Sequence, residues 1–303
     1  MRQAVLILGM HRSGTSAMAG ISHLLGAAAP ATMMATAADN PTGFWESLPI
    51  AGINEAMLTA LGTRWYDCLP LDTTAVDARS RQLATARCTA VITSEFGDAA
   101  IFVMKDPRFS LLLDLWLPAF AAMNLAVAPV LALRHPTEVL ASLRRRDGMP
   151  PDIAGPLWLH YTLEAERLTR NRPRAVLSYD AFLHDWRGCV ERVTAEAHIT
   201  WPVPIDTAAP KIAAFLRPQL RHHYAAPRAA AAARPPIADW IAETYDALRR
   251  IEAGDDAGQF ARLDQVRADF APWRARAPRV SDADATALLV PRTIGSSNAA
   301  GGR

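Results

Sequence analysis

Residues 6–16 read Leu6-Ile-Leu-Gly-Met-His-Arg-Ser-Gly-Thr-Ser16 and indicate the class of fold. The stretch passes from an apolar run, typical of a buried strand, through a turn of small residues into the helix-like segment Ala17 to Leu25. Gly9 and Gly14 let the backbone turn tightly, so successive main-chain N–H groups can converge on an anion at the positive end of the helix. The stretch therefore predicts a phosphate-binding loop between a strand and a helix.

The loop departs from the common nucleoside-triphosphate loop at one informative position. In the pattern G-x-x-x-x-G-K-[ST] a lysine follows the second glycine, but here Thr15 stands there and the nearby cation is Arg12, inside the loop. The sequence thus suits a phosphate-like group but lacks the lysine that serves a γ-phosphate.

Strands and helices alternate along the chain beyond this first unit. Further buried strands are predicted at residues 101–104, 126–133 and 175–179. Helices are predicted at residues 50–61, 76–96, 111–124, 137–146, 157–169, 181–197, 237–251 and 259–273. Pro129 is expected to demote the third strand or to force a bulge in it. The alternation predicts an α/β fold, a P-loop-type parallel sheet with helices on both faces.

The length and composition favour one large domain. A chain of 303 residues, 50% of them hydrophobic, can bury a sizeable core. We expect a single α/β domain over residues 1–275, in which residues 225–275 form a helical C-terminal appendage. Residues 276–303 are rich in Ala, Ser, Gly and Asp, a composition that predicts a disordered tail.

The net charge and the spacing of the cysteines exclude several classes of protein. The net charge of +2 gives no reason to expect nucleic acid or a membrane surface as a partner. Cys68, Cys88 and Cys189 are far apart, with no C-x-x-C, which indicates neither a disulfide framework nor a zinc site. The apolar run Ala4 to Leu8 is too short for a signal peptide and no run of about 20 apolar residues follows, so we expect a cytoplasmic protein without a membrane span.

A second motif follows the predicted third strand. In Leu131-Ala-Leu-Arg-His-Pro-Thr-Glu-Val-Leu-Ala-Ser142, Arg134 ends the strand and Ser142 lies eight residues later on the next predicted helix. A guanidinium fork and a hydroxyl near a helix N-terminal turn are suitable ligands for a phosphate dianion.

Together the two motifs resemble those of sulfotransferases that use 3′-phosphoadenosine 5′-phosphosulfate (PAPS) and release PAP. The resemblance implies no metal and assigns the first motif to the 5′-phosphosulfate and Arg134 with Ser142 to the 3′-phosphate. Tyr179, beside Asp180, would meet the adenine, support the site or serve packing. The donor-binding residues implied within the first motif are His11, Arg12, Ser13, Gly14, Thr15 and Ser16.

Three further segments, 40–46 (NPTGFWE), 105–108 (KDPR) and 178–180 (SYD), are similar to stretches of bacterial carbohydrate-type sulfotransferases. The resemblance covers roughly residues 1–225. It implies that Lys105 bridges the sulfuryl oxygens and that Arg12 neutralises charge growing on the leaving phosphate.

The residue that takes the proton of the acceptor stays open. Cytosolic small-molecule sulfotransferases carry Lys at the place of Arg12 and a histidine base after the second strand, where this chain has Asp106 and Pro107. The resemblance to heparan-type and tyrosyl-protein members favours a carboxylate, with Glu46 first and Asp106 second. His11, inside the loop, is a third candidate.

The acceptor is not identified either: it offers a hydroxyl or an amine, and a carbohydrate is one option. A late basic loop, which would close over the 3′-phosphate, is a further expectation at Arg217, Arg221, His222 and His223. The competing functions are a P-loop kinase or NTPase and a non-catalytic protein of the same fold that binds PAP or another nucleotide.

Overall fold

The computed structural model describes residues 1–36, 43–216, 233–277 and 279. Its strands are β1 (Arg2–Leu8), β2 (Ile101–Lys105), β3 (Leu125–Leu133) and β4 (Ala175–Ser178). They form one parallel sheet in the order β2-β1-β3-β4. The carboxyl ends of all four strands therefore lie along the same edge of the sheet, where ligands bind in open α/β folds.

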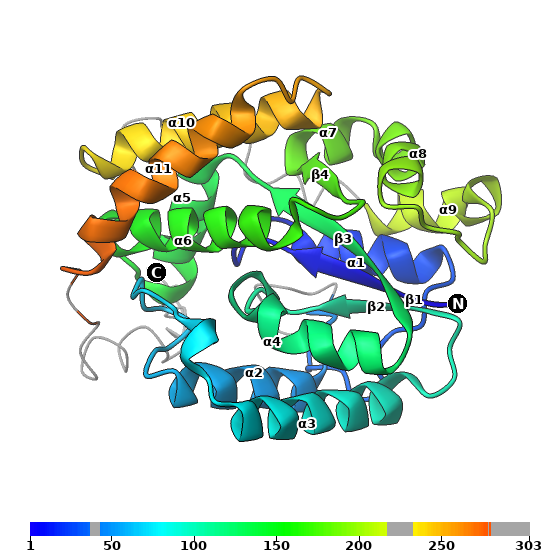
Figure 1. Ribbon diagram of the computed structural model, residues 1–303. Helices are drawn as coiled ribbons and strands as arrows, with labels where there is room; N and C mark the ends of the chain where they lie inside the picture. Colours follow the sequence, from blue (N-terminus) through cyan, green and yellow to red (C-terminus); the bar gives the residue numbers. More distant parts are fainter. Residues whose placement is uncertain (37–42, 217–232, 278, 280–303) are drawn as a thin grey trace, which may run out of the picture.

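The helices account for most of the remaining described chain (Figure 1). Those before β3 are α1 (Thr15–Leu24), α2 (Leu48–Ala60), α3 (Ala78–Phe96) and α4 (Phe109–Ala122), with a short 3₁₀ turn, η1, at Thr73–Ala75. Those after β3 are α5 (Pro136–Asp147), α6 (Pro151–Thr169), α7 (Tyr179–His184), α8 (Trp186–Glu196), α9 (Ile205–Phe215), α10 (Ile237–Glu252) and α11 (Gln259–Arg274).

Helices cover both faces of the sheet. Along β1, Leu6 and Leu8 pack into one core with side chains of α2 to α6, α10 and α11. Val5 and Ile7 point the opposite way, into a second core with α1, α7, α8 and α9. This alternation with period two is what a strand buried on both sides requires, and it confirms the predicted α/β fold class.

Pro129 neither demotes β3 nor interrupts it, so that expectation was wrong. The ladder between β1 and β3 is unbroken, with Leu6 opposite Pro129. The ladder between β3 and β4 begins only one residue later, at Val130. Pro129 therefore stands where one edge of β3 has no strand partner yet, and a residue without an N–H is tolerated at such a position.

The helix predicted over residues 181–197 is divided into α7 and α8. Asp185 causes the break, because its carboxylate accepts a hydrogen bond from the Gly188 N–H at 2.9 Å and caps the second helix. Helix α6 also begins earlier than predicted, at Pro151 rather than near Leu157, since proline is favoured in the first turn. Helix α9 had not been predicted.

The two last helices, α10 and α11, pack on each other and lie together across the top of the view in Figure 1, and α10 also packs on α6 and β4. Glu252, at the end of α10, accepts a hydrogen bond from the Ser178 N–H at 2.7 Å, and Arg249 donates to the Ser178 hydroxyl. The appendage is thus tied to the carboxyl end of β4.

The division into one domain remains a prediction. The predicted tail lies outside the described residues apart from Arg276, Ala277 and Arg279.

None of the helices that the structure describes is long and apolar enough to cross a membrane.

Candidate functional site

The loop between β1 and α1 is shaped by its two glycines. Gly9 (φ 133°) and Gly14 (φ 86°) both have positive φ, and Gly14 is the N-cap of α1. A Cβ at Gly14 would lie 2.3 Å from the ring of Tyr179, and one at Gly9 would lie 2.5 Å from the Ala132 carbonyl oxygen. No side chain in the described part of the chain caps α1, so the N-terminus of this helix is a suitable place for an anion.

Ser110, which the sequence analysis missed, binds the main chain at the start of the loop. The Gly9 N–H donates to the hydroxyl of Ser110 on α4 at 2.9 Å, and Ser110 is fully buried. The contact joins residues 101 positions apart, which is why no local pattern could reveal it. It fixes the point where β1 passes into the loop.

The structure brings the two sequence motifs together. Arg12 donates from Nε to the Ser142 hydroxyl at 3.0 Å, and Arg134 donates from Nη1 to the Arg12 carbonyl at 3.1 Å. The guanidinium of Arg134 lies over the ring of Tyr179, 4.8 Å from its centroid, and also binds Glu138 at 2.8 Å. Two arginines, a hydroxyl and an aromatic ring thus meet beside the N-terminus of α1.

The remaining donor-site candidates lie in the same loop. Ser13 and Thr15 are buried, and the Ser13 N–H closes the turn by donating to the Met10 carbonyl at 3.2 Å. Ser16 donates from its hydroxyl to the Phe44 carbonyl at 3.3 Å. This bond connects α1 to the segment that carries Glu46. The four residues expected to form a late basic loop, between 217 and 223, lie outside the described residues.

A second cluster of charged side chains forms around the end of β2. Lys105 makes an ion pair with Glu46, and Arg108 binds Asp106 through two bonds of 2.8 and 2.9 Å. Arg108 also binds Glu55 on α2 and lies 3.6 Å from Glu46. Glu46 is therefore beside Lys105 and Asp106, as its candidacy requires, whereas Arg108 and Glu55 were not among the predicted site residues.

Burial controls the electrostatics of this cluster. Glu46 is only 6% exposed, and its burial raises the pKa of the carboxyl, an effect that Lys105 opposes and Asp106 reinforces. Burial works against the charged form of Arg108 too, but the nearby carboxylates outweigh it and raise the pKa of its guanidinium. A carboxyl with a raised pKa, held between two cations, is suited to accept a proton.

His11 faces an aromatic wall. Its ring lies 4.7 Å from that of Trp65 and 5.8 Å from that of Tyr161. Nε2 of His11 is buried without a hydrogen-bond partner among the described residues. Burial, and then the charge of Arg146, lowers the pKa of this imidazole well below its usual value. Burial therefore favours the neutral form of His11.

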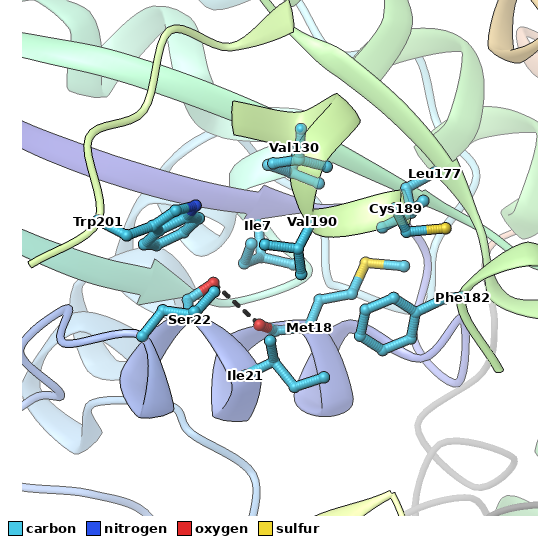
Figure 2. Close-up of a pocket in the computed structure, with 12 residues that line it drawn as sticks. Ile7, Met18, Ile21, Ser22, Val130, Leu177, Phe182, Cys189, Val190 and Trp201 are labelled. Atoms are coloured by element: carbon cyan, nitrogen blue, oxygen red, sulfur yellow. Dashed lines mark hydrogen bonds between the residues drawn. The ribbon is translucent and has the colours of Figure 1, made fainter. Parts of the chain in front are cut away.

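Two hollows in the molecule lie away from these clusters. Figure 2 shows a small one between the sheet, α1 and α8, lined by apolar side chains such as Ile7, Met18 and Val190. Its free volume of about 20 Å³ has room for about one water molecule. A groove of about 1240 Å³ opens between α2 and α3. Neither is lined by a residue of the loop or of the charged clusters, so the polar groups at the strand ends define the candidate site.

Substitution of Gly14 tests how tightly the loop is packed. Gly14→Ala is expected to lower the free energy of unfolding by about 1–3 kcal/mol, because it adds an unfavourable positive φ and a clash with Tyr179. The matched control is Gly52→Ala in α2, where a Cβ meets nothing within 4 Å; it should stabilise by up to about 1 kcal/mol. Urea denaturation of both variants measures the difference, and equal effects would contradict the tight packing.

Comparisons with known proteins add little to this picture. No protein-family model matches the chain, and no curated protein matches it. Among solved structures, the chain is similar to the sulfotransferase domain of the olefin synthase from Synechococcus PCC 7002, with 17% sequence identity and a TM-score of 0.42. The match covers 89% of this chain and 95% of that one. A likeness of this degree carries no conclusion, so the function has to rest on the residues of the site.

Proposed function

We propose that this protein is a sulfotransferase that moves the sulfuryl group of PAPS to a hydroxyl or amine of an acceptor. The observation that carries the proposal is the meeting of Arg12, Ser142, Arg134 and Tyr179 beside the N-terminus of α1, which no described side chain caps. An anion-binding loop that lacks the usual lysine but carries Arg12, next to a second arginine and a hydroxyl, suits a nucleotide with one phosphate on the 5′ oxygen and another on the 3′ oxygen.

The described residues fit PAPS as a co-substrate. The main-chain N–H groups at the start of α1 would receive the 5′-phosphosulfate. Arg134 and Ser142 would hold the 3′-phosphate, and Tyr179 would lie beside the nucleoside. PAPS, when bound, supplies the sulfuryl group and a phosphate as leaving group.

The chain's own residues would then stabilise charge and move one proton. Arg12 and the loop amides would offset the negative charge that grows on the leaving phosphate. Lys105 would bind the sulfuryl oxygens, and Glu46 would take the proton of the acceptor. Asp106 is the second candidate base, but both of its oxygens bind Arg108. The acceptor itself stays open, with a carbohydrate as one candidate.

Binding and label transfer test the proposal against its rivals. Calorimetric titration should show that PAP binds much more tightly than AMP or ATP. Transfer of label from ³⁵S-PAPS to a panel of sugars, phenols and amines would establish catalysis. A protein that binds PAP but never transfers label is the non-catalytic alternative, whereas preferential binding of ATP would support a kinase or NTPase.

Arg12 should affect donor binding and turnover together. Arg12→Ala is expected to weaken PAP binding by about 10-fold or more, since a hydrogen bond to a charged group contributes roughly 1.5–3 kcal/mol, and to slow transfer as well. The control is Arg87→Ala, at an exposed position on α3, which should leave both unchanged. A chelator should have no effect on the wild type; a strict magnesium requirement would instead support the kinase reading.

A further inference from the structure

Arg108 is the centre of the charged cluster at the end of β2. The residue is only 7% exposed. Its guanidinium makes two hydrogen bonds to Asp106 and one to Glu55, and it lies 3.6 Å from Glu46. The Arg108 N–H also donates to Asp106 at 2.9 Å. Arg108 thus joins three carboxylates from the end of β2, from α2 and from the segment before α2, and the planar fork fixes their directions.

Lys105 is attached to the same cluster in a different way. It makes its ion pair with one oxygen of Glu46 through a single ammonium group at the end of a flexible stem. A sulfuryl group brings negative charge to the carboxyl end of β2 and would compete with Glu46 for this ammonium. Lys105 is therefore the exchangeable partner of Glu46, and Arg108 is the fixed one.

The balance of charge makes the fixed partner necessary. Lys105 and Arg108 supply two positive charges, while Glu46, Asp106 and Glu55 supply three negative charges. When Lys105 turns to an anionic donor, Arg108 alone faces all three carboxylates. Without Arg108, and with Lys105 engaged by the donor, the buried Glu46 would have Asp106 as its charged neighbour, and both burial and Asp106 favour the protonated carboxyl.

The other titratable groups around Glu46 do not replace Arg108. Tyr161 on α6 donates its hydroxyl to the Trp65 carbonyl at 2.8 Å, and burial raises the pKa of this phenol well above its usual value. His11 in the loop lies in the same region and is kept neutral, with its pKa lowered by burial. Neither supplies positive charge to Glu46 at neutral pH.

We propose that Arg108 is a positioning residue, which keeps Glu46 ionised and in place while Lys105 is given up to the donor. This role rests on the proposed function, since it assigns Lys105 to the donor and Glu46 to the acceptor. In this role Arg108 would contact neither the donor nor the acceptor.

The test compares Arg108→Gln and Arg108→Lys with the wild type. We expect Arg108→Gln to lower kcat by about 10–10²-fold, the cost of misplacing a catalytic group, with PAP affinity within about two-fold of wild type. Activity requires ionised Glu46 and is lost as the pH falls through its pKa. Removal of a nearby opposite charge raises a carboxyl pKa by about 1–3 units. The fall of kcat on the acid side of its pH profile should therefore occur at a higher pH in Arg108→Gln. Arg108→Lys keeps a positive charge, so it should shift this fall less.

Two further measurements separate positioning from a general loss of structure. Glu46→Gln combined with Arg108→Gln should be no slower than Glu46→Gln alone, because Arg108 acts through Glu46. The ¹³C resonance of the Glu46 carboxyl should titrate at a higher pH in Arg108→Gln than in the wild type, with PAPS bound and no acceptor present, because PAPS carries the sulfuryl group that draws Lys105 away. An unmoved titration, or losses that multiply in the double variant, would overturn the role of Arg108. Near-normal turnover of Glu46→Gln with a shifted titration would instead overturn Glu46 as the base and leave its control by Arg108 standing.

Discussion

Glu46→Gln is expected to cut turnover by about 10²–10⁴, the usual contribution of a general base, while the affinity for PAP stays close to that of the wild type. Glutamine preserves the shape of the side chain and its place beside Lys105 but cannot take a proton. The buried carboxyl, held between Lys105 and Arg108, is the group of this cluster best suited to that step. Label transfer at saturating PAPS measures turnover, and calorimetry with PAP measures affinity.

A matched control for this variant is Glu191→Gln, at an exposed position on α8, which should leave turnover unchanged. Asp106→Asn completes the set, because it removes the second candidate carboxylate. Near-normal turnover in Glu46→Gln together with collapse in Asp106→Asn would move the role of base to Asp106.

The double variant Arg134→Ala and Ser142→Ala should lose the preference for PAP over AMP. These two residues are assigned to the 3′-phosphate, and each hydrogen bond lost to a charged group costs roughly 1.5–3 kcal/mol, or about 10–10²-fold in affinity. The affinity for AMP, which lacks that phosphate, should change much less. Calorimetric titration of both nucleotides against both proteins measures the preference.

The single variant Ser142→Ala serves as the milder member of this series, since Arg134 also lies on Tyr179 and binds the Arg12 carbonyl. It removes the hydroxyl, and with it the bond from Arg12 Nε, but it keeps the stacking of Arg134 on Tyr179 and its bond to the Arg12 carbonyl. An unchanged affinity for AMP would show that a reduced PAP preference comes from the 3′-phosphate and not from a changed loop. Equal affinities of the wild type for PAP and AMP would refute the PAPS assignment altogether.

The parts of the molecule predicted from the sequence are those with a local signal. The turn around Gly9 and Gly14 is visible because glycine spacing and the apolar run before it are contiguous, and the pair Arg134 and Ser142 is visible because their spacing is fixed within one strand–helix unit. The division of the helix at Asp185 was missed, since an aspartate is compatible with both a helix interior and a cap, and its contact with Gly188 decides which occurs.

The rest of the site depends on contacts that no local pattern carries. Ser110 lies 101 residues from the glycine that it holds, and Glu55 lies 53 residues from Arg108. An exposed-looking acid on a helix and a small polar residue after Phe109 give no sign of these partners. Sequence reasoning could therefore name Glu46 and Lys105 as candidates and quote Arg108 in the segment 105–108, but it could not foresee that Arg108 would bind Glu55 and approach Glu46.

The bond from Arg134 to the carbonyl of Arg12 has a consequence for which nucleotides can bind. It couples Arg134, assigned to the 3′-phosphate, directly to the main chain of the loop that would bind the 5′-phosphosulfate. The protein would thereby fix the distance between the two anionic groups of its ligand. Positional isomers that carry the same charge but a different separation, such as nucleotides phosphorylated at the 2′ rather than the 3′ oxygen, should then be rejected on length alone, whatever base they carry.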